Sequence, residues 1–599
     1  MKQLSISESK WKGYVGYLLD YVEKAQLLDE DLWALFVKQY REQNDKDNGW
    51  RGEYWGKMMR GAVLTYTCTG NEKVYVCMEK TVRDLFSVQE ADGRISSYPR
   101  EKEFNGWDMW CRKYVLLGNL YFYDICKDEG LKAEILKVLS AHLDYIVAHI
   151  GGTDDKKSIF ATSHFYGCLN SCSILEPVVK MYKLTKKSEY LDFAKYIVDG
   201  GFCADMNLIE ECLQKTKYPY QFAHTKAYEM MSCFQGLLEY YEITGEEKYF
   251  IAAKNFADMV HESDITMIGC AGCLSEFFDN SVNTQTKPYE GDMQETCVTV
   301  TWMNLCYKLL QMTNDVKYAD WMERSALNAM GGAVNTENQK ALRARVIDGT
   351  TGKAYIGARG LLPFDSYSPL YNDRRGKGIG GFNVMEEGQS YGCCACIGSA
   401  GVALMGLFGV MQIGDGICIN LYQDCITRTR INEELVTVTI RDCLMKEGCA
   451  YIEVDGNSCF LLKMRIPAWS NTYKVFIDDE ELNVQAENGY ITIEKEWSNQ
   501  TIRLELDVSL KKYFLNGKIA FMKGPYVLSK DNRLGGKVKP FVNVEKIQSK
   551  TILNQAFRNN VTVQMNVDGE SIVLCDYAQA GKNFDQENCD ISVWFDMEV

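Results

Sequence analysis

The first two thirds of the chain carry the spacing of amphipathic helices. Apolar residues recur at intervals of three and four positions, as where Ile174, Val178, Met181 and Tyr182 fall on one helical face. An α-helix turns once in about 3.6 residues, so this spacing gathers the apolar side chains into one buried stripe. The pattern predicts a helical region that extends to residue 413.

A short phrase repeats between these helical segments. Its form is Tyr-x-x-Thr-Gly followed by a charged residue, with copies beginning at Tyr66, Tyr182, Tyr241 and Leu310 and a degenerate copy at Tyr123. Successive copies lie 57 to 69 residues apart, a period typical of a helical hairpin repeated around an axis or along a solenoid. The glycine suits a helix C-terminus, where left-handed backbone angles are needed. Five copies with room for a sixth predict an (α/α)6 toroid, and an open superhelix is the alternative.

The pattern changes near residue 414. Short runs such as 435–440 and 490–493 alternate apolar and polar residues, and turn signals such as Asp455-Gly456 separate them. Alternation with a period of two predicts antiparallel strands packed as a sandwich. We therefore expect a mainly α chain with added β structure, divided into a helical barrel at 1–413, a β-sandwich at 414–524, and a second small β domain or extension of the sandwich at 525–599.

Composition narrows the classes of function. A net charge of −15 argues against a nucleic-acid partner, which needs a basic surface. No stretch reaches the ~18 apolar residues that span a bilayer, so we expect no membrane partner. The N-terminus lacks the apolar core of a secretory signal. Together with 23 cysteines, this favours a reducing, cytoplasmic location, where thiols stay free or bind metal. Whether the chain forms a homodimer is left open.

Two groups of cysteines could carry chemistry. Glu295 and Cys297 precede one apolar helix, while Cys393, Cys394 and Cys396 open another. Adjacent cysteines bond poorly to each other, but both can reach one metal ion. Four oxygen and sulfur ligands suit tetrahedral Zn²⁺. Packing of ordinary buried thiols is the alternative, and a closed structural zinc site is another.

The order of these motifs resembles a known family. Glu-Thr-Cys in the fifth hairpin, Cys-Cys in the sixth, and the β-rich runs around 461–470 and 488–497 resemble glycoside hydrolase family 127, the β-L-arabinofuranosidase family. The resemblance covers nearly the whole chain. It implies that Zn²⁺ is bound by Glu295, Cys297, Cys393 and Cys394.

The resemblance also implies roles in a retaining glycosidase. Cys393 matches the nucleophile and Glu276 the acid/base, although Glu276 could simply cap a helix. His224 matches a substrate-binding histidine, with a structural role as the alternative. Trp107, Asp108 and Tyr114 are further substrate-binding candidates that could equally be core residues. The implied substrate is an oligosaccharide or glycoside, with a terminal β-L-arabinofuranoside as the leading choice.

Other interpretations stay open at this point. Cys396 adds a third thiol, so a shift of the motif by two positions would place Ala395 where the nucleophile belongs. A toroid without a catalytic metal could be a uronyl hydrolase, a lyase or a sugar epimerase. A carbohydrate-binding protein with a structural zinc is the non-enzymatic alternative.

Overall fold

The computed structural model describes most of the chain. The described residues are 1–44, 46–272, 274–287, 293–336, 346–347, 354–355, 363–375, 383–386, 389–535, 538–542, 544–567, 569–582 and 590–598. Among them, no helix is long and apolar enough to cross a membrane.

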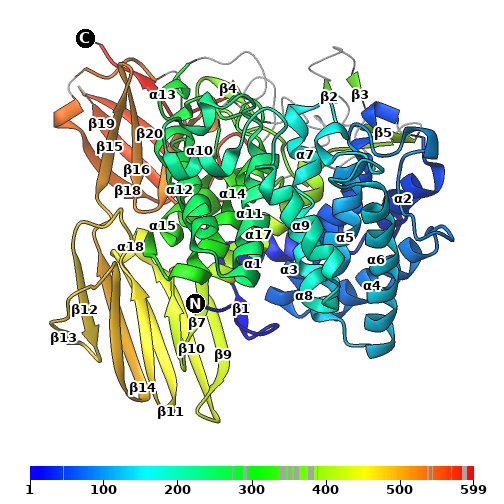
Figure 1. The fold of residues 1–599 in the computed structure, drawn as a ribbon. Coiled ribbons are helices and arrows are strands. Elements are labelled where there is room, and N and C mark those ends of the chain that lie inside the picture. The colour runs from blue at the N-terminus through cyan, green and yellow to red at the C-terminus, as the bar shows by residue number, and fades with distance from the viewer. Residues whose placement is uncertain are drawn as a thin grey trace.

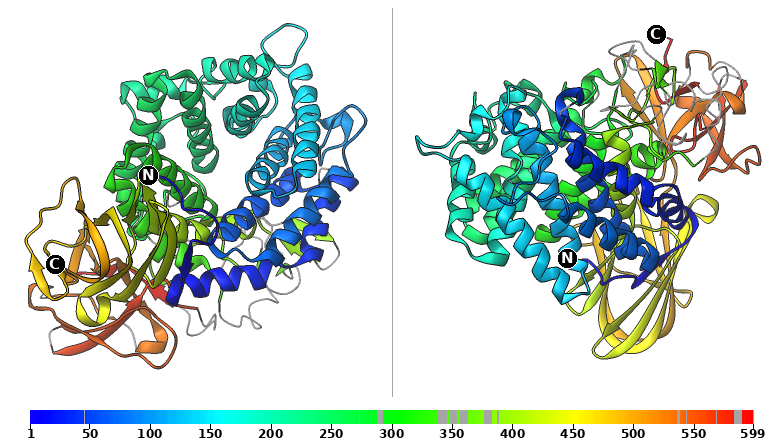
Figure 2. Two further views of the ribbon diagram at one scale, coloured as in Figure 1. Left: turned by 90° about the horizontal axis from the view of Figure 1, so that it is seen from below. Right: turned by 90° about the vertical axis from the view of Figure 1, so that its right-hand side faces the viewer.

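Six helices of the described chain form the inner wall of a ring, which is seen end-on in the left view of Figure 2. Each packs against the next, and α17 closes the ring by packing against α3. The toroid is therefore closed, and the open superhelix is excluded. The inner helices are α3 (Tyr54–Thr69), α5 (Asp108–Ile125), α8 (Leu175–Thr185), α11 (Ala227–Thr244), α14 (Thr296–Thr313) and α17 (Cys393–Gly409).

The inner helices are buried around most of their circumference. Every residue of α17 is buried, because small residues such as Gly398 and Gly401 let its neighbours approach closely. The repeated Tyr-x-x-Thr-Gly phrase ends these helices, as predicted. Gly70, Gly245 and Asn314 adopt left-handed angles just after α3, α11 and α14.

An outer layer of amphipathic helices covers the ring. These helices bury one stripe and expose the other, since only their inner face meets the ring. They are α1 (Gly13–Val22), α2 (Glu30–Glu42), α4 (Glu72–Phe86), α6 (Glu129–His149), α9 (Ser188–Asp199), α12 (Glu247–Asp264) and α15 (Val316–Arg324).

Short helical segments occupy many of the connections. They are η1 (Glu23–Leu27), η2 (Lys46–Glu53), η3 (Arg100–Lys102), η4 (Ile159–Ala161), η5 (Tyr166–Cys168), α7 (Leu169–Cys172), α10 (Leu208–Gln214), η6 (Pro219–Gln221), α13 (Ser281–Thr284), η7 (Ser325–Met330) and α16 (Gly331–Ala333). Two short two-stranded sheets are also present. One pairs β2 (Val346–Ile347) with β3 (Ala354–Tyr355), and the other pairs β5 (Asn383–Glu386) with β6 (Gln389–Tyr391).

Two mainly antiparallel sheets lie beside the ring, one above the other in Figure 1. The first sheet recruits an N-terminal strand, because β1 (Ser9–Trp11) pairs with β9. Its other strands are β7 (Val410–Ile413), β8 (Gly416–Ile419), β9 (Cys425–Ile431), β10 (Glu434–Cys443), β11 (Cys449–Arg465), β12 (Tyr473–Ile477), β13 (Glu480–Leu482) and β14 (Tyr490–Leu506), with α18 (Leu444–Glu447) between β10 and β11.

The second sheet begins at Leu510 and includes β4 (Asp373–Arg374) from the helical part. Its other strands are β15 (Leu510–Leu515), β16 (Lys518–Lys523), β17 (Tyr526–Asp531), β18 (Gln548–Ile552), β19 (Thr562–Val567), β20 (Glu570–Asp576), β21 (Asp590–Ser592) and β22 (Phe595–Asp596), with η9 (Asn532–Leu534) and η10 (Val544–Lys546) in its connections.

Buried polar contacts fix the sheets to the helices. Arg465 at the end of β11 is fully buried and forms ion pairs with Asp320 and Glu323 of α15. The Trp469 indole N–H donates to Glu323 at 2.7 Å. Removal of one member of this cluster would leave a buried charge unpaired. The cluster therefore fixes how the β part packs against the helical ring.

Candidate active site

A cavity of about 180 Å³ opens where the inner helices begin. Glu53 precedes α3, Trp107 precedes α5, Lys226 precedes α11, Glu295 precedes α14, and Cys393 begins α17. Free backbone N–H groups at helix N-termini favour negative charge. The ring therefore directs several positive helix ends toward one pocket, which suits bound thiolates and carboxylates. The lining residues are Trp50, Glu53, Lys57, Trp107, Trp110, Tyr166, Lys226, Tyr228, Glu229, Glu276, Glu295, Cys297 and Cys393.

Glu295, Cys297, Cys393 and Cys394 converge at this pocket. One ligand atom from each lies within 4.8 Å of all the others, and all four residues are buried. The Cys393 and Cys394 Sγ atoms are 3.8 Å apart, and Cys394 Sγ lies 3.2 Å from Glu295 Oε1. Two sulfur atoms on one tetrahedral zinc ion, each bonded at 2.3 Å, are about 3.8 Å apart. The donor set and its spacing therefore fit a single metal ion.

The three thiols have different electrostatic environments. Hydrogen bonds from Cys297 and Cys394 hold the pKa of Cys393 well below the ordinary thiol value. Burial instead raises the pKa of Cys297 and of Cys394 well above that value. Cys393 also lines the cavity, whereas Cys394 is fully buried. Cys393 is thus the thiol of this cluster best suited to act as a nucleophile toward a molecule in the pocket.

Lys57 and Glu53 form a buried ion pair beside this cluster that the sequence did not reveal. Lys57 Nζ lies 2.9 Å from Glu53 and 3.9 Å from Cys297 Sγ. Burial opposes the charge on Lys57, but Cys297 and Glu53 outweigh it and raise the lysine pKa. Burial raises the pKa of Glu53 to about 7 despite the lysine. The only sequence signal was their spacing of four residues at a helix start.

We expect Lys57→Met to destabilise the protein by about 3–5 kcal/mol, because it leaves Glu53 buried without its partner. The free energy of unfolding, measured in urea, tests this. Adding Glu53→Gln to the same chain should recover part of the loss. Equal stability of the wild type and the single variant would show that the pair contributes nothing.

Glu276 lies on the pocket wall in the connection between α12 and α13. Its carboxylate forms an ion pair with Lys226, and the Glu276 carbonyl accepts the backbone N–H of Ala227 at the start of α11. About a fifth of its side chain is exposed, so it can reach both a ligand and water. The pocket therefore combines a carboxyl group with a thiol cluster.

Comparison with known proteins agrees with this arrangement. Residues 17–343 match the family described as β-L-arabinofuranosidase, GH127 catalytic domain, and residues 416–508 match its middle domain. The chain belongs to glycoside hydrolase family 127. It is therefore a glycoside hydrolase, as predicted, and its substrate is a carbohydrate. No curated protein sequence matches the chain.

Solved structures share the whole fold of this family 127 chain. A GH127 β-arabinofuranosidase has a TM-score of 0.72 at 16% identity, with 100% of this chain and 98% of that chain covered. A GH127 β-L-arabinofuranosidase from Geobacillus stearothermophilus T6 has a TM-score of 0.72 at 15% identity, with 98% and 100% covered. At such identities the similarity establishes the toroid with its β domains.

Three polar groups in the pocket of this glycoside hydrolase lack a hydrogen-bond partner among the described residues. They are the indole N–H groups of Trp50 and Trp107 and one carboxylate oxygen of Glu229, and Trp107 and Glu229 are buried residues. A buried polar atom without a partner costs free energy unless a ligand or water satisfies it. Trp107 thus lies in the pocket, where the sequence analysis expected it. Glu229 is a further candidate for contact with a ligand, and the sequence did not reveal it.

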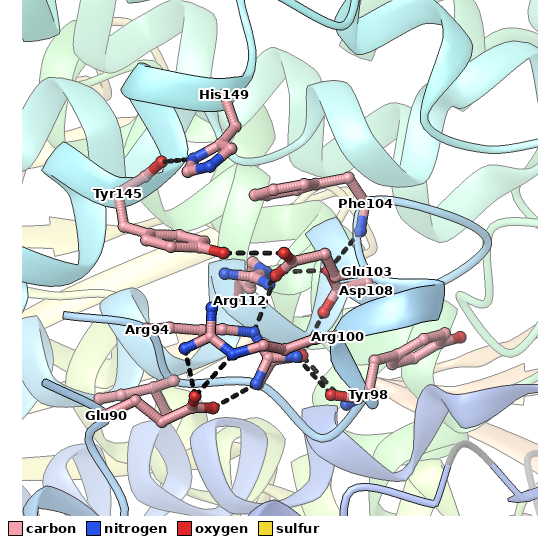
Figure 3. A network of polar contacts seen from close by, with 12 residues as sticks. Glu90, Arg94, Tyr98, Arg100, Glu103, Phe104, Asp108, Arg112, Tyr145 and His149 are labelled. Carbon is pink, nitrogen blue, oxygen red and sulfur yellow. Dashed lines mark hydrogen bonds and ion pairs between the residues drawn. The ribbon is translucent and has the colours of Figure 1, made fainter. Parts of the chain in front are cut away.

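Asp108 and Tyr114 do not line the pocket. Asp108 is fully buried and accepts hydrogen bonds from the Phe104 backbone and from Arg112 (Figure 3). It also accepts a hydrogen bond from the Ser96 hydroxyl. The same network joins Glu103 to Arg94, Arg112 and Tyr145. Asp108 therefore anchors the loop that presents Trp107 rather than contacting a ligand in this pocket.

Tyr114, His224 and Cys396 all lie outside the lining of the pocket. The Tyr114 hydroxyl shares a hydrogen bond with Tyr228, one layer behind the pocket. His224 is outside the pocket lining, and its imidazole contacts Asp205 at 2.6 Å. Cys396 is buried and is not part of the four-residue cluster. At the start of α11, Lys226 takes the pocket position that was expected for His224.

Proposed function

We propose that this enzyme is a retaining exo-glycosidase that cleaves terminal β-L-arabinofuranosides with a zinc-bound Cys393 as nucleophile. The observation that carries the proposal is the convergence of Glu295, Cys297, Cys393 and Cys394 at the floor of a pocket that also contains Glu276. A cavity of about 180 Å³ is smaller than most ligand pockets, which favours one terminal sugar over an internal chain segment.

A bound Zn²⁺ would be held by the four clustered residues and would stabilise the thiolate form of its cysteine ligands at neutral pH. Glu295 and Cys297 precede and begin α14, while Cys393 and Cys394 begin α17. The ligands therefore come from rigid helix ends. Cys394 faces the protein interior and acts as an anchor, and Cys393 faces the substrate.

The reaction proceeds in two steps at the anomeric carbon. Cys393 Sγ attacks this carbon as the bond to the leaving oxygen breaks, and Glu276 donates a proton to that oxygen. Glu276 then removes a proton from water, whose oxygen attacks the same carbon and releases the Cys393 thiolate. Two displacements retain the configuration, as in glycosidases that use a carboxylate nucleophile.

The remaining pocket residues orient the sugar and the acid/base. Lys226 holds the Glu276 carboxyl group in place through its ion pair. The Trp107 N–H and the free Glu229 oxygen can respectively donate to and accept from sugar hydroxyl groups. Trp50 and Trp110 add apolar surface, which suits packing against the ring of a sugar.

Turnover of aryl glycosides tests this proposal. We expect hydrolysis of an aryl β-L-arabinofuranoside, a first product of retained configuration in NMR, and loss of activity after a chelator removes zinc. Aryl α-L-arabinofuranoside and β-D-galactopyranoside serve as matched substrates. Preferred turnover of another sugar would contradict the substrate assignment. Full activity in metal-free protein would contradict the mechanism.

A further inference from the structure

A second group of metal-binding side chains lies outside the catalytic pocket. Cys203 and Asp205 occupy the turn between α9 and α10, and His224 lies between η6 and α11. One ligand atom from each residue lies within 4.8 Å of the other two. Three residues from two separate loops thus present sulfur, oxygen and nitrogen donors to one point.

We propose that Cys203, Asp205 and His224 form a second metal site that binds Zn²⁺, with water as the fourth ligand. Thiolate, imidazole and carboxylate are all zinc ligands, and three protein ligands with one open position form a common tetrahedral arrangement. His224 Nε2 and Asp205 Oδ2 are 2.6 Å apart and share a hydrogen bond. A zinc ion bound between these two atoms, with Zn–N and Zn–O bonds of about 2.0–2.2 Å, would replace this hydrogen bond. The two atoms would have to move apart by less than about 1 Å to accommodate it.

Two backbone N–H groups are directed at the Cys203 sulfur. They belong to Asp205 and Met206, which follow Cys203 in the same turn. Such N–H groups stabilise a metal-bound thiolate as well as a free one. A bound divalent ion would displace the thiol proton, which then leaves to solvent.

The fold keeps space open between the donors. Gly167 has left-handed backbone angles, and a Cβ atom there would lie 2.5 Å from Cys203 Sγ and 2.8 Å from His224 Nε2. The side chains of Asp205 and His224 are 59% and 27% exposed, so an ion can enter from solvent. The site is thus both unobstructed and accessible.

A metal ion here would support the wall of the catalytic pocket. It would tie the turn that contains Cys203 to the segment that leads from His224 to Lys226, which contacts Glu276. Tyr166, which lines the pocket, directly precedes Gly167 beneath the cluster. The second site is chemically separate from the pocket cluster and does not depend on the proposed reaction.

Metal content of the full-length, reduced protein tests the site. We expect two zinc ions per chain in the wild type and one in Cys203→Ser, Asp205→Asn and His224→Ala. Cys459→Ser and Asp154→Asn are matched controls at exposed positions and should keep two. The zinc ion retained in the pocket shows that each depleted variant is still folded.

A variant without the pocket metal site distinguishes the proposal of a second metal site from the proposal of a catalytic zinc. The double variant Cys297→Ala/Cys394→Ala keeps only two pocket ligands, so it should lose the pocket zinc and keep the ion at Cys203. Co²⁺ added to this variant should give a thiolate-to-metal absorption band that a further Cys203→Ser change removes. A single zinc ion that persists in the variants at 203, 205 and 224 but disappears in Cys297→Ala/Cys394→Ala would overturn the second site alone. A zinc ion present only at Cys203 would overturn the catalytic metal alone.

Discussion

Cys393→Ala is expected to lower kcat by about 10⁴-fold or more, the scale seen when a catalytic nucleophile is removed. The variant deletes the sulfur that lines the pocket and leaves Glu295, Cys297 and Cys394 in place. Three ligands with a vacant fourth position can still hold zinc. The expected signature is therefore loss of turnover with the metal retained.

Steady-state rates on an aryl glycoside, together with zinc content, measure this effect. Cys396→Ala is the matched control, because it removes a buried thiol three positions further along the same helix, outside the cluster. This control is expected to change stability more than turnover. If Cys396→Ala abolished turnover while Cys393→Ala retained it, the assignment of Cys393 as the nucleophile would be wrong, and Cys396 would take that role. Mass spectrometry of a trapped reaction should place the sugar on Cys393.

Glu276→Gln is expected to lower turnover of alkyl glycosides by about 10²–10⁴-fold, the usual contribution of a general acid. The amide keeps the shape of the carboxyl group but donates no proton to the leaving oxygen. Aryl glycosides with acidic leaving groups should lose much less in the first step, because their oxygen departs without protonation. The second step should then become rate-limiting, since no base activates water.

The measurement compares kcat/KM across leaving groups of increasing pKa. Loss that grows steeply with leaving-group pKa, and a burst of product with the aryl substrate, are expected for Glu276→Gln. Glu246→Gln, at an exposed position before α12, is the matched control. A uniform loss across all leaving groups would assign Glu276 to positioning instead of proton transfer.

The sequence determined much of the fold because its signals are local. Helical spacing and the repeated Tyr-x-x-Thr-Gly phrase predicted the hairpins, and the phrase lies at helix ends where a left-handed residue such as Gly70 is needed. Alternation after residue 414 predicted the β part. The pairing of β1 with β9 was missed, because it joins residues more than 400 positions apart.

The sequence also indicated the four members of the pocket cluster, because each pair lies within one helical turn. Glu295 with Cys297 and Cys393 with Cys394 are short motifs at helix starts. Only the tertiary structure brings the two pairs together across 96 residues, by closing α17 against α14.

Which polar side chains face the pocket was decided by tertiary structure alone. Lys226 reaches the pocket while His224, two residues earlier, points to Asp205, and Asp108 turns into the network that anchors its loop. Helical or alternating spacing identifies a buried face, but the direction of a residue at a helix start depends on the loop before it. Closure of the ring sets those loops, because it fixes where all the inner helices begin.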